Sequence, residues 1–519
     1  MMPQAERNAF VNGLAAGKTQ LLVRRLINDL ETPVSAYLKV AHGRPYASLL
    51  ESVEGGAVNG RYSIVTLSPD TVWRCLDGKA EIARGDAILS DTFTPEELPA
   101  LQSLRALIAA SKFDLPADLP PMAAGLFGVF GYDMVRLLEP LGPANPDPLN
   151  LPDAVLARPG LIAIFDSVKH EIVLVAATYA DTGADPEAAY AAAVARLEEF
   201  EDRLRSPMPI QREPEPVPAP DFKSPVDGDG YAAMVAKAKD YIRAGDIFQV
   251  VLAHRFSAPW SQDPFAFYRA LRRGNPSPYL FYLDYAAFQL AGSSPEILVR
   301  LKDGRVTIRP LAGTRPRGTT PELDKQLEAE LLADPKELAE HLMLLDLGRN
   351  DVGRVSAPGT VEVTESFVVE RYSQVMHIVS NVNGQADPKL DAVDTLLAAL
   401  PAGTLSGAPK VRAMEIIDEL ETEKRGVGYG GGVGYISANG EADICIVLRT
   451  AMFTDNRIFV QAGAGVVADS DPAAEYAETL AKARAPMKAA EEAWRFSATT
   501  HAQPLATAKG AAGSSDVAA

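Results

Sequence analysis

Residues 231–253 read YAAMVAKAKDYIRAGDIFQVVLA, and this stretch decides the fold class. It predicts a helix over about 231–244, followed at once by a strand over 247–253. Further strands are predicted at 289–292 and 297–301. Because strands and helices alternate without a uniform βαβ period, we expect an α+β fold of large β-sheets flanked by helices rather than a doubly wound sheet.

Before this stretch, proline recurs every few residues in SPMPIQREPEPVPAPDFKSPVDGD, which predicts an extended linker because proline fixes φ and donates no backbone hydrogen bond. Upstream of it, short strands are predicted at 63–67, 161–165 and 172–176, and a helix at 186–205. The end of the chain is rich in Ala, Ser, Thr and Gly, which favours a disordered tail. The predicted divisions are an N-terminal lobe (1–205), a linker (206–229), a C-terminal domain (230–496) and the tail (497–519).

Bulk composition excludes several classes of protein. The chain has 519 residues and a formal charge of −18, which argues against nonspecific nucleic-acid binding because such proteins need a basic surface. The two cysteines, Cys75 and Cys445, lie far apart in apolar sequence, so neither a disulfide framework nor a cysteine metal site is expected. No apolar run approaches the ~18 residues of a membrane span, and the N-terminus lacks a signal pattern. We expect a cytoplasmic protein that binds neither membranes nor nucleic acid.

Two predicted helices begin with a capping aspartate and a proline and then carry glutamates three residues apart. In the first, Asp334 and Pro335 precede Glu337 and Glu340. In the second, Asp471 and Pro472 precede Glu475 and Glu478. Residues at this spacing share one helix face and could offer oxygen ligands to Mg²⁺. From the residues alone, solvated helix faces are the commoner explanation, and Glu337 also occupies a capping-box position.

Other candidates are individually weak. Gly313, the run 426–434 and the run 463–465 could bring backbone amides close to an anion, but none has the spacing of a nucleotide-binding motif. His377 lies in a predicted strand, where a histidine is usually a satisfied core residue. The residues Arg349, Asn350 and Asp351 are most simply a polar helix end.

Taken together, these segments resemble the chorismate-utilising enzymes from about residue 49 to 485. In the C-terminal half, the segments that carry the resemblance, in the family's order, are IFQVVLAHRF, NPSPYLFYL, GSSPEILV, RPLAGTRPRG, EHLMLLDLGRNDVGRV, MHIVSNV, PAGTLSGAPK, GYGGGVGYI, DICIVLRTA and QAGAGVV. The resemblance implies the fold of that family and a Mg²⁺-dependent enzyme.

Carried over position by position, the resemblance implies that Glu340 and Glu478 bind Mg²⁺ with support from Glu337 and Glu475. It places His377 and Thr404 beside the leaving hydroxyl group of chorismate, with His377 as the candidate general acid. The implied substrate-binding residues are Gly313, Thr314, Tyr429, Arg449, Gly463, Ala464 and Gly465.

Two positions indicate which reaction of the family is expected. Members that add water to the ring have a lysine base where this chain has Gln249, and aminodeoxychorismate synthases have a nucleophilic lysine where it has Ala312. Ammonia needs neither lysine. The resemblance therefore implies the branch that joins chorismate and ammonia and releases pyruvate to form anthranilate, at the first step of tryptophan biosynthesis. The alternatives are an aminodeoxychorismate synthase component I and a non-catalytic regulator that binds tryptophan or chorismate.

The N-terminal lobe also resembles this branch through LLES (49–52), GRYSIV (60–65) and GLFGVFGYDMVR (125–136). In that branch, LLES and the PSPYL segment form a tryptophan feedback site, and the matching positions are Glu51, Ser52, Pro278, Tyr279 and Leu280. Neither cysteine lies in a glycine-rich nucleophile turn. A separate glutamine amidotransferase subunit is therefore expected to supply the ammonia.

Overall fold

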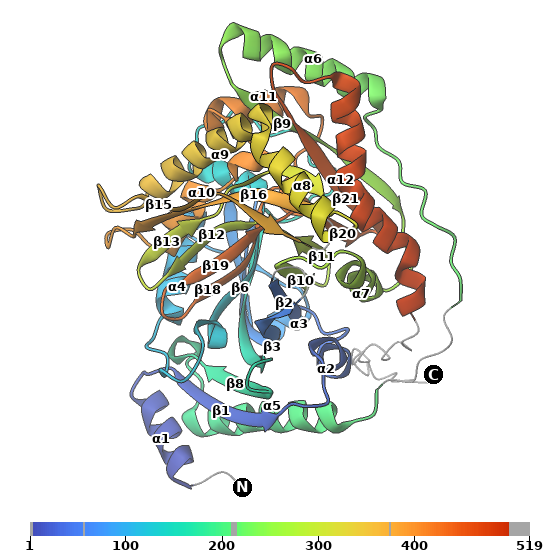
Figure 1. Cartoon of the computed structure of the whole chain (residues 1–519). Coiled ribbons are helices and arrows are strands. Elements are labelled where there is room, and N and C mark those ends of the chain that lie inside the picture. Colours follow the sequence, from blue (N-terminus) through green and yellow to red (C-terminus); the bar gives the residue numbers. More distant parts are fainter. Residues whose placement is uncertain (1–3, 55–57, 209–214, 373–374, 498–519) are drawn as a thin grey trace, which may run out of the picture.

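The protein is described here as a computed structural model that covers residues 4–54, 58–208, 215–372 and 375–497. The predicted tail lies outside the described residues except for Ser497, and part of the predicted linker also lies outside them. Helices and large antiparallel sheets are mixed along the chain, which confirms the α+β class (Figure 1).

The helices are α1 Gln4–Ala15, α2 Pro33–Val40, α3 Asp86–Leu89, α4 Ala100–Ser111, α5 Pro186–Arg205, α6 Gly228–Ala244, α7 Pro264–Gly274, α8 Pro321–Ala333, α9 Pro335–Gly353, α10 Ala392–Ala399, α11 Lys410–Leu420 and α12 Pro472–Glu492. Short 3₁₀ helices are η1 Pro121–Ala123, η2 Tyr132–Leu137, η3 Ala180–Thr182, η4 Gly403–Leu405, η5 Gly426–Gly428 and η6 Ala493–Phe496.

The strands are β1 Gln20–Ile27, β2 Ser48–Glu54, β3 Val58–Leu76, β4 Lys79–Arg84, β5 Thr94–Pro95, β6 Gly125–Phe130, β7 Ala154–Asp166, β8 Glu171–Thr178, β9 Gln249–Pro259, β10 Tyr279–Asp284, β11 Gln289–Ser294, β12 Ile297–Lys302, β13 Arg305–Ile308, β14 Leu311–Pro316, β15 Glu362–Arg371, β16 Val375–Gln385, β17 Gly407–Ala408, β18 Gly432–Ser437, β19 Ala442–Ile446, β20 Thr450–Thr454 and β21 Arg457–Val466.

Antiparallel pairing joins most of the strands into two long runs that share β7, and β4 and β5 extend from the far end of β3. One run has the order β1, β8, β7, β3, β2, β10, β11, β20, β21, β9 and β17. The other run also begins at β7 and has the order β7, β6, β18, β19, β12, β13 and β16. Strand β16 pairs in addition with β14 and β15. In both runs, strands from before the proline-rich segment pair directly with strands from after it.

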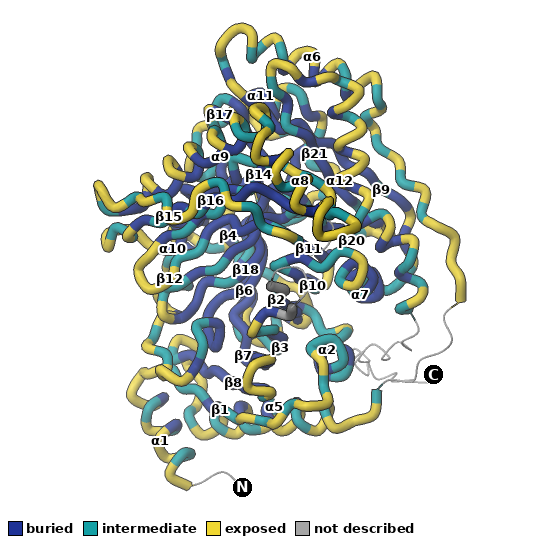
Figure 2. The backbone as a smooth tube through the Cα atoms, viewed as in Figure 1, coloured by how far each residue is buried: buried dark blue, intermediate teal, exposed yellow. Residues whose placement is uncertain are grey.

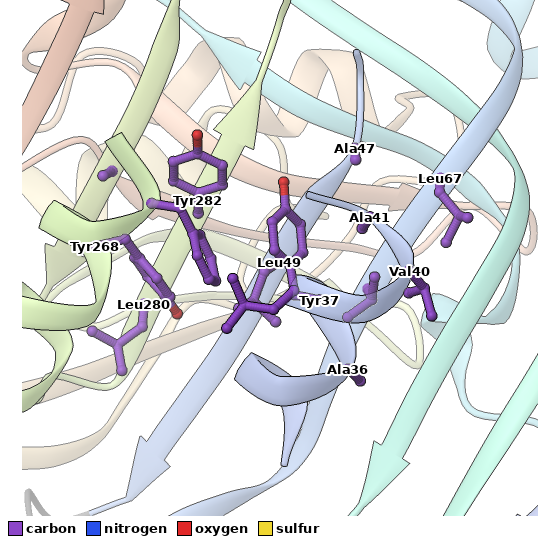
Figure 3. Close-up of a cluster of buried hydrophobic side chains, with 14 of the residues drawn as sticks. Ala36, Tyr37, Val40, Ala41, Ala47, Leu49, Leu67, Tyr268, Leu280 and Tyr282 are labelled. Atoms are coloured by element: carbon purple, nitrogen blue, oxygen red, sulfur yellow. The ribbon is translucent and has the colours of Figure 1, made fainter. Parts of the chain in front are cut away.

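A shared apolar core also connects the two halves. The Tyr37 ring on α2 stacks on Phe265 of α7 with a centroid distance of 4.5 Å and meets Tyr282 of β10 edge-on at 5.7 Å. Leu49 from β2 and Leu280 from β10 pack in the same cluster (Figure 3). Burial of this apolar surface holds the N-terminal strands against α7 and β10.

Helices cover the outer faces of the strand runs, so the strands are mostly buried and the helices mostly half-exposed (Figure 2). Helix α12 packs along β21 and against α6 and α7, while α9 packs on β14 and β16. The two predicted carboxylate helices therefore pack on different runs, α9 on strands of the second and α12 on a strand of the first. None of the described helices is both long and apolar enough to cross a membrane.

Some predicted boundaries differ from the observed ones. The prediction of 63–67 was too short, because β3 continues to Leu76 through a register shift at Pro69 and Thr71. Residues 228–229 belong to α6 rather than to the linker, because the Asp227 side chain caps that helix at Gly230. Cys75 and Cys445 are both buried and unpaired, as expected.

Candidate active site

The two carboxylate helices begin as their sequences predict. The Asp334 side chain accepts hydrogen bonds from the backbone amides of Lys336 and Glu337 at the start of α9, and the Asp471 side chain accepts one from Ala474 at the start of α12. Such caps satisfy amides that have no partner within the helix. The caps therefore stabilise the first turn of each helix, and these turns carry Glu337 and Glu475.

The glutamates of the two helices lie within electrostatic reach of one another. Burial raises the pKa of Glu340, and the negative charges of Glu337 and Glu478 raise it further, against the opposing charge of Lys482. Burial also raises the pKa of Glu475, with a further contribution from Glu478. The structure thus places Glu340 within electrostatic reach of Glu337 and Glu478, and Glu475 within reach of Glu478.

Two of these carboxylates already have cationic partners. Glu337 accepts a hydrogen bond from Arg315 at 2.9 Å, and Glu478 pairs with Lys482, one turn later on α12, at 2.7 Å. Across the described ranges, no group of three or more His, Cys, Asp or Glu side chains is arranged to hold a metal.

His377 lies on β16 opposite Thr314 of β14. Its Nδ1 atom is 3.0 Å from both the Gly313 carbonyl oxygen and the Thr314 hydroxyl. Because a carbonyl can only accept, we assign the ring hydrogen to Nδ1, which leaves Nε2 as an acceptor. Burial lowers the pKa of His377 to about 4, so the ring is neutral near pH 7.

Glu296 was given no role from the sequence, although it lies in the quoted GSSPEILV segment. It sits between β11 and β12 with 7% of its surface exposed. Burial raises its pKa to about 8, and Thr404 donates a hydrogen bond to its Oε1 at 3.3 Å. Lys482 and Arg449 are also close enough to act on its charge. The site therefore holds a carboxylic acid that keeps its proton near neutral pH.

Arg449 and Tyr429 are both fixed by their surroundings. Arg449 has a left-handed backbone with φ of 47°, which costs a non-glycine residue about 1–2 kcal/mol and must be offset by neighbouring contacts. The Tyr429 hydroxyl group bonds the backbone of Gly463 on β21. A Cβ at Gly463 would lie 2.6 Å from the Leu252 carbonyl oxygen and 2.9 Å from the Tyr429 hydroxyl, so this close approach requires glycine.

The two positions that separate the family's reactions are both buried. Gln249 is 3% exposed on β9, and its Oε1 atom has no hydrogen-bond partner among the residues that the structure describes. A Cβ at Gly465 would lie 2.6 Å from its Nε2 atom, so Gly465 leaves room for the amide. Ala312 is 7% exposed on β14, beside Gly313.

The five residues of the expected inhibitor site also come together. Strands β2 and β10 are antiparallel neighbours, with Ser52 opposite Tyr279 and Glu51 opposite Leu280. The cavity beside them has a volume of about 840 Å³, and its lining includes all five: Glu51, Ser52, Pro278, Tyr279 and Leu280. Of the expected substrate and metal residues, none lines this cavity, although Glu296 does.

The Glu51 carboxylate at this cavity has a cationic partner. Arg272 of α7 donates to its Oε2 at 2.7 Å and to its Oε1 at 2.9 Å, and the Tyr268 hydroxyl donates to Oε2 at 2.5 Å. The carboxylate is therefore neutralised by a residue from the other half of the chain. Its first role is to hold β2 against α7.

Comparison with known proteins agrees with this architecture. The family model described as chorismate binding enzyme matches residues 63–488. Anthranilate synthase component 1 of Cereibacter sphaeroides is 56% identical over 490 residues, which cover 94% of this chain and 98% of that protein. The Thermus thermophilus protein of the same name is 46% identical over 472 residues, which cover 91% and 97%.

Solved structures give the same result. Anthranilate synthase component I from Streptococcus pneumoniae TIGR4 has a TM-score of 0.74 and 38% identity, covering 89% of this chain and 99% of that one. The menaquinone-specific isochorismate synthase MenF from Escherichia coli has a TM-score of 0.67 at 20% identity, covering 93% and 100%. The second likeness concerns the fold alone.

Proposed function

Since the chain belongs to the family of chorismate binding enzymes, we propose that it is the large subunit of an anthranilate synthase, which converts chorismate and ammonia to anthranilate and pyruvate. Curated relatives that are 45% to 56% identical over most of the chain carry the name anthranilate synthase component 1.

The observation that carries the proposal is the chemistry of Gln249 and Ala312. Neither position offers a lysine that could activate water or form a covalent adduct with the substrate. Ammonia is a nucleophile without such help. The buried Gln249 Oε1 would accept a hydrogen bond from it and hold it in place, which also satisfies an amide oxygen that is otherwise costly to bury.

The proton for the departing hydroxyl group comes from Glu296 in this proposal. Ammonia forms a C–N bond with the ring, the C–O bond of the hydroxyl breaks, and the Glu296 proton lets that group leave as water. Thr404 orients the Glu296 carboxyl group, and neutral His377 accepts a hydrogen bond through Nε2 rather than serving as the acid. The aminated ring then loses pyruvate, as the ether C–O bond breaks and a ring proton is transferred to the enolpyruvyl methylene carbon.

Substrate binding follows from the other side chains. Arg449 and Tyr429 would hold the enolpyruvyl carboxylate, and the backbone of Gly313, Thr314, Gly463, Ala464 and Gly465 would approach the ring. Glu340 and Glu478 fit a Mg²⁺ ion because Glu340 is a partly buried carboxylate with two like charges beside it, and Mg²⁺ commonly takes one or two carboxylates plus water and substrate oxygens. When bound, the ion would neutralise the substrate's ring carboxylate.

The proposal includes a partner and an inhibitor. Ammonia would come from glutamine through a separate glutamine amidotransferase subunit, since Cys75 and Cys445 are both buried. Tryptophan would bind in the 840 Å³ cavity beside the paired strands β2 and β10. A cytoplasmic location is expected for such an enzyme.

The test uses the purified chain with chorismate, a magnesium salt and an ammonium salt, with anthranilate followed by its fluorescence. We expect product from ammonia and none from glutamine. Failure to form anthranilate from ammonia would contradict the proposed reaction. Formation of anthranilate from glutamine by this chain alone would contradict the two-subunit assignment.

A further inference from the structure

A small second cavity is also lined by Glu296, which lines the 840 Å³ cavity as well. Its volume is about 30 Å³, and it is lined by residues of α9, β12, β13 and β19, by Pro310 and by the segment 399–404. Most of its lining is aliphatic or glycine. Three lining side chains are polar: Glu296, Asp351 and Thr404.

Asp351 is buried, although its sequence context suggested a polar helix end. It is 4% exposed, and its Oδ2 atom accepts a hydrogen bond from Lys410 at 2.8 Å. Its Oδ1 atom has no hydrogen-bond partner within the described part of the chain. An unpaired buried acceptor costs about 1–3 kcal/mol, and more for a charged group, so a partner for this oxygen is expected.

The cavity can supply that partner as water. A buried water needs roughly 10–15 Å³ of accessible volume and two to four polar neighbours. The cavity exceeds this volume, and Asp351, Thr404 and Glu296 provide the neighbours. Voids lined only by apolar side chains stay dry, but this one has a charged side chain in its wall.

We propose that this cavity holds an ordered water that joins Asp351 Oδ1 to the Glu296 and Thr404 pair, and that Asp351 is a positioning residue for the proton of Glu296. The inference rests on the proposed role of Glu296 as the proton donor. The water donates one hydrogen bond to Asp351 Oδ1. Its other donor and its lone pairs can form hydrogen bonds with the Glu296 carboxyl group or the Thr404 hydroxyl. Asp351 thereby acts on the reaction without touching substrate.

The surrounding charges give the direction of the effect. Lys482 and Arg449 face Glu296 and favour its ionised form, while Tyr372 also lies near it. Lys410 and Arg354 face Asp351. Burial raises the pKa of Asp351, and Lys410 and Arg354 oppose this rise. In the proposal, the ionised Asp351 carboxylate acts on Glu296 through the water and helps it to keep its proton. Replacing Asp351 by asparagine would leave Lys410 unopposed and lower the pKa of Glu296.

The test is the pH profile of kcat/KM for the ammonia-dependent reaction of Asp351→Asn. Dividing the kcat/KM of the variant by that of the wild type at each pH removes the effect of ammonia ionisation, because this effect is the same for both proteins. We expect the fall in activity on the basic side to move to lower pH by roughly 0.5–1 unit, with the chorismate KM nearly unchanged. The matched control is Asp346→Asn on the same helix, where the side chain is 75% exposed, and we expect no shift.

A second measurement does not depend on the variant's folding. A crystal structure of the wild-type chain, at a resolution that places buried waters, should show density within hydrogen-bond distance of Asp351 Oδ1 and of Glu296 or Thr404. A dry cavity or an unshifted profile would overturn the inference. Full activity of Glu296→Gln would contradict the assignment of Glu296 as the proton donor, and the role of Asp351 would be contradicted with it. If Glu296→Gln were inactive and the pH profile of Asp351→Asn matched that of the wild type, only the proposed role of Asp351 would be contradicted.

Discussion

The Glu296 carboxyl group carries the reaction's proton in our proposal, and Glu296→Gln tests this role. An amide of the same shape cannot release a proton, so we expect kcat to fall by roughly 10²–10⁴-fold while the fold persists. Because the Glu296 pKa is about 8, the wild type should lose its acid form as pH rises through that value. The exposed Glu362→Gln is the control. Wild-type turnover in Glu296→Gln would show that another group protonates the leaving hydroxyl.

Glu340 and Glu478 are tested in the same way for metal binding. Replacing either by glutamine removes a negative charge that would neutralise the cation, so we expect activity to collapse and the apparent affinity for Mg²⁺ to weaken. Titration of activity with a magnesium salt measures both effects, and thermal unfolding checks the fold. Glu491→Gln, exposed on the same α12, should behave as wild type. Unchanged magnesium dependence in Glu340→Gln or Glu478→Gln would remove that residue from the proposed metal site.

The positions of some candidate site residues follow from local sequence signals, and those of others do not. The carboxylates on α9 and α12 follow helix spacing and caps, which are local properties. Glu296 has no local signature, because its raised pKa comes from burial, which depends on how the whole chain packs. Asp351 was predicted to lie at a polar helix end, whereas it is buried in the structure. Exposure of a single charged residue depends on tertiary packing, and one sequence does not reveal it.

At the scale of elements, prediction succeeded where the signals are local. Helix α5 occupies Pro186–Arg205 as predicted, because Asp185 caps it and proline opens it. Strand β3 was underestimated because Ser68, Pro69 and Asp70 resemble a turn, whereas the strand passes them through a bulge. The pairing of β2 with β10 joins residues more than 200 positions apart and has no local signal.

The contact between β2 and α7 gives a prediction about elements. Arg272→Gln would leave the Glu51 carboxylate buried without its cation, and we expect the free energy of unfolding to fall by ~1–3 kcal/mol. Tyr268→Phe removes one hydrogen bond to the same group and should cost less, ~1 kcal/mol. Urea unfolding of both variants measures the difference. Equal stability of Arg272→Gln and the wild type would show that this ion pair does not hold the two elements together.

At the scale of the whole molecule, the two halves are not independent bodies joined by a linker. Their strands pair (Figure 1), and their aromatic side chains share one core (Figure 3). The lining of the 840 Å³ cavity also comes from both halves. Glu296 lines that cavity as well. A ligand in this cavity could therefore bias the arrangement of both halves and act on the proposed proton donor, which lines the same cavity.

The last prediction concerns tryptophan, which we expect to inhibit from this cavity without competing for the substrate site. Ser52 lines the cavity opposite Tyr279, and loss of its hydroxyl would leave a polar group of the inhibitor unsatisfied at a cost of ~1–3 kcal/mol. Ser52→Ala should therefore raise the tryptophan concentration for half-inhibition by about tenfold or more, with uninhibited turnover nearly intact. Ser63→Ala is the matched control, because Ser63 lies on neighbouring β3 opposite Glu51 and does not line the cavity. Loss of chorismate turnover with full tryptophan sensitivity in Ser52→Ala would place Ser52 in the active site instead.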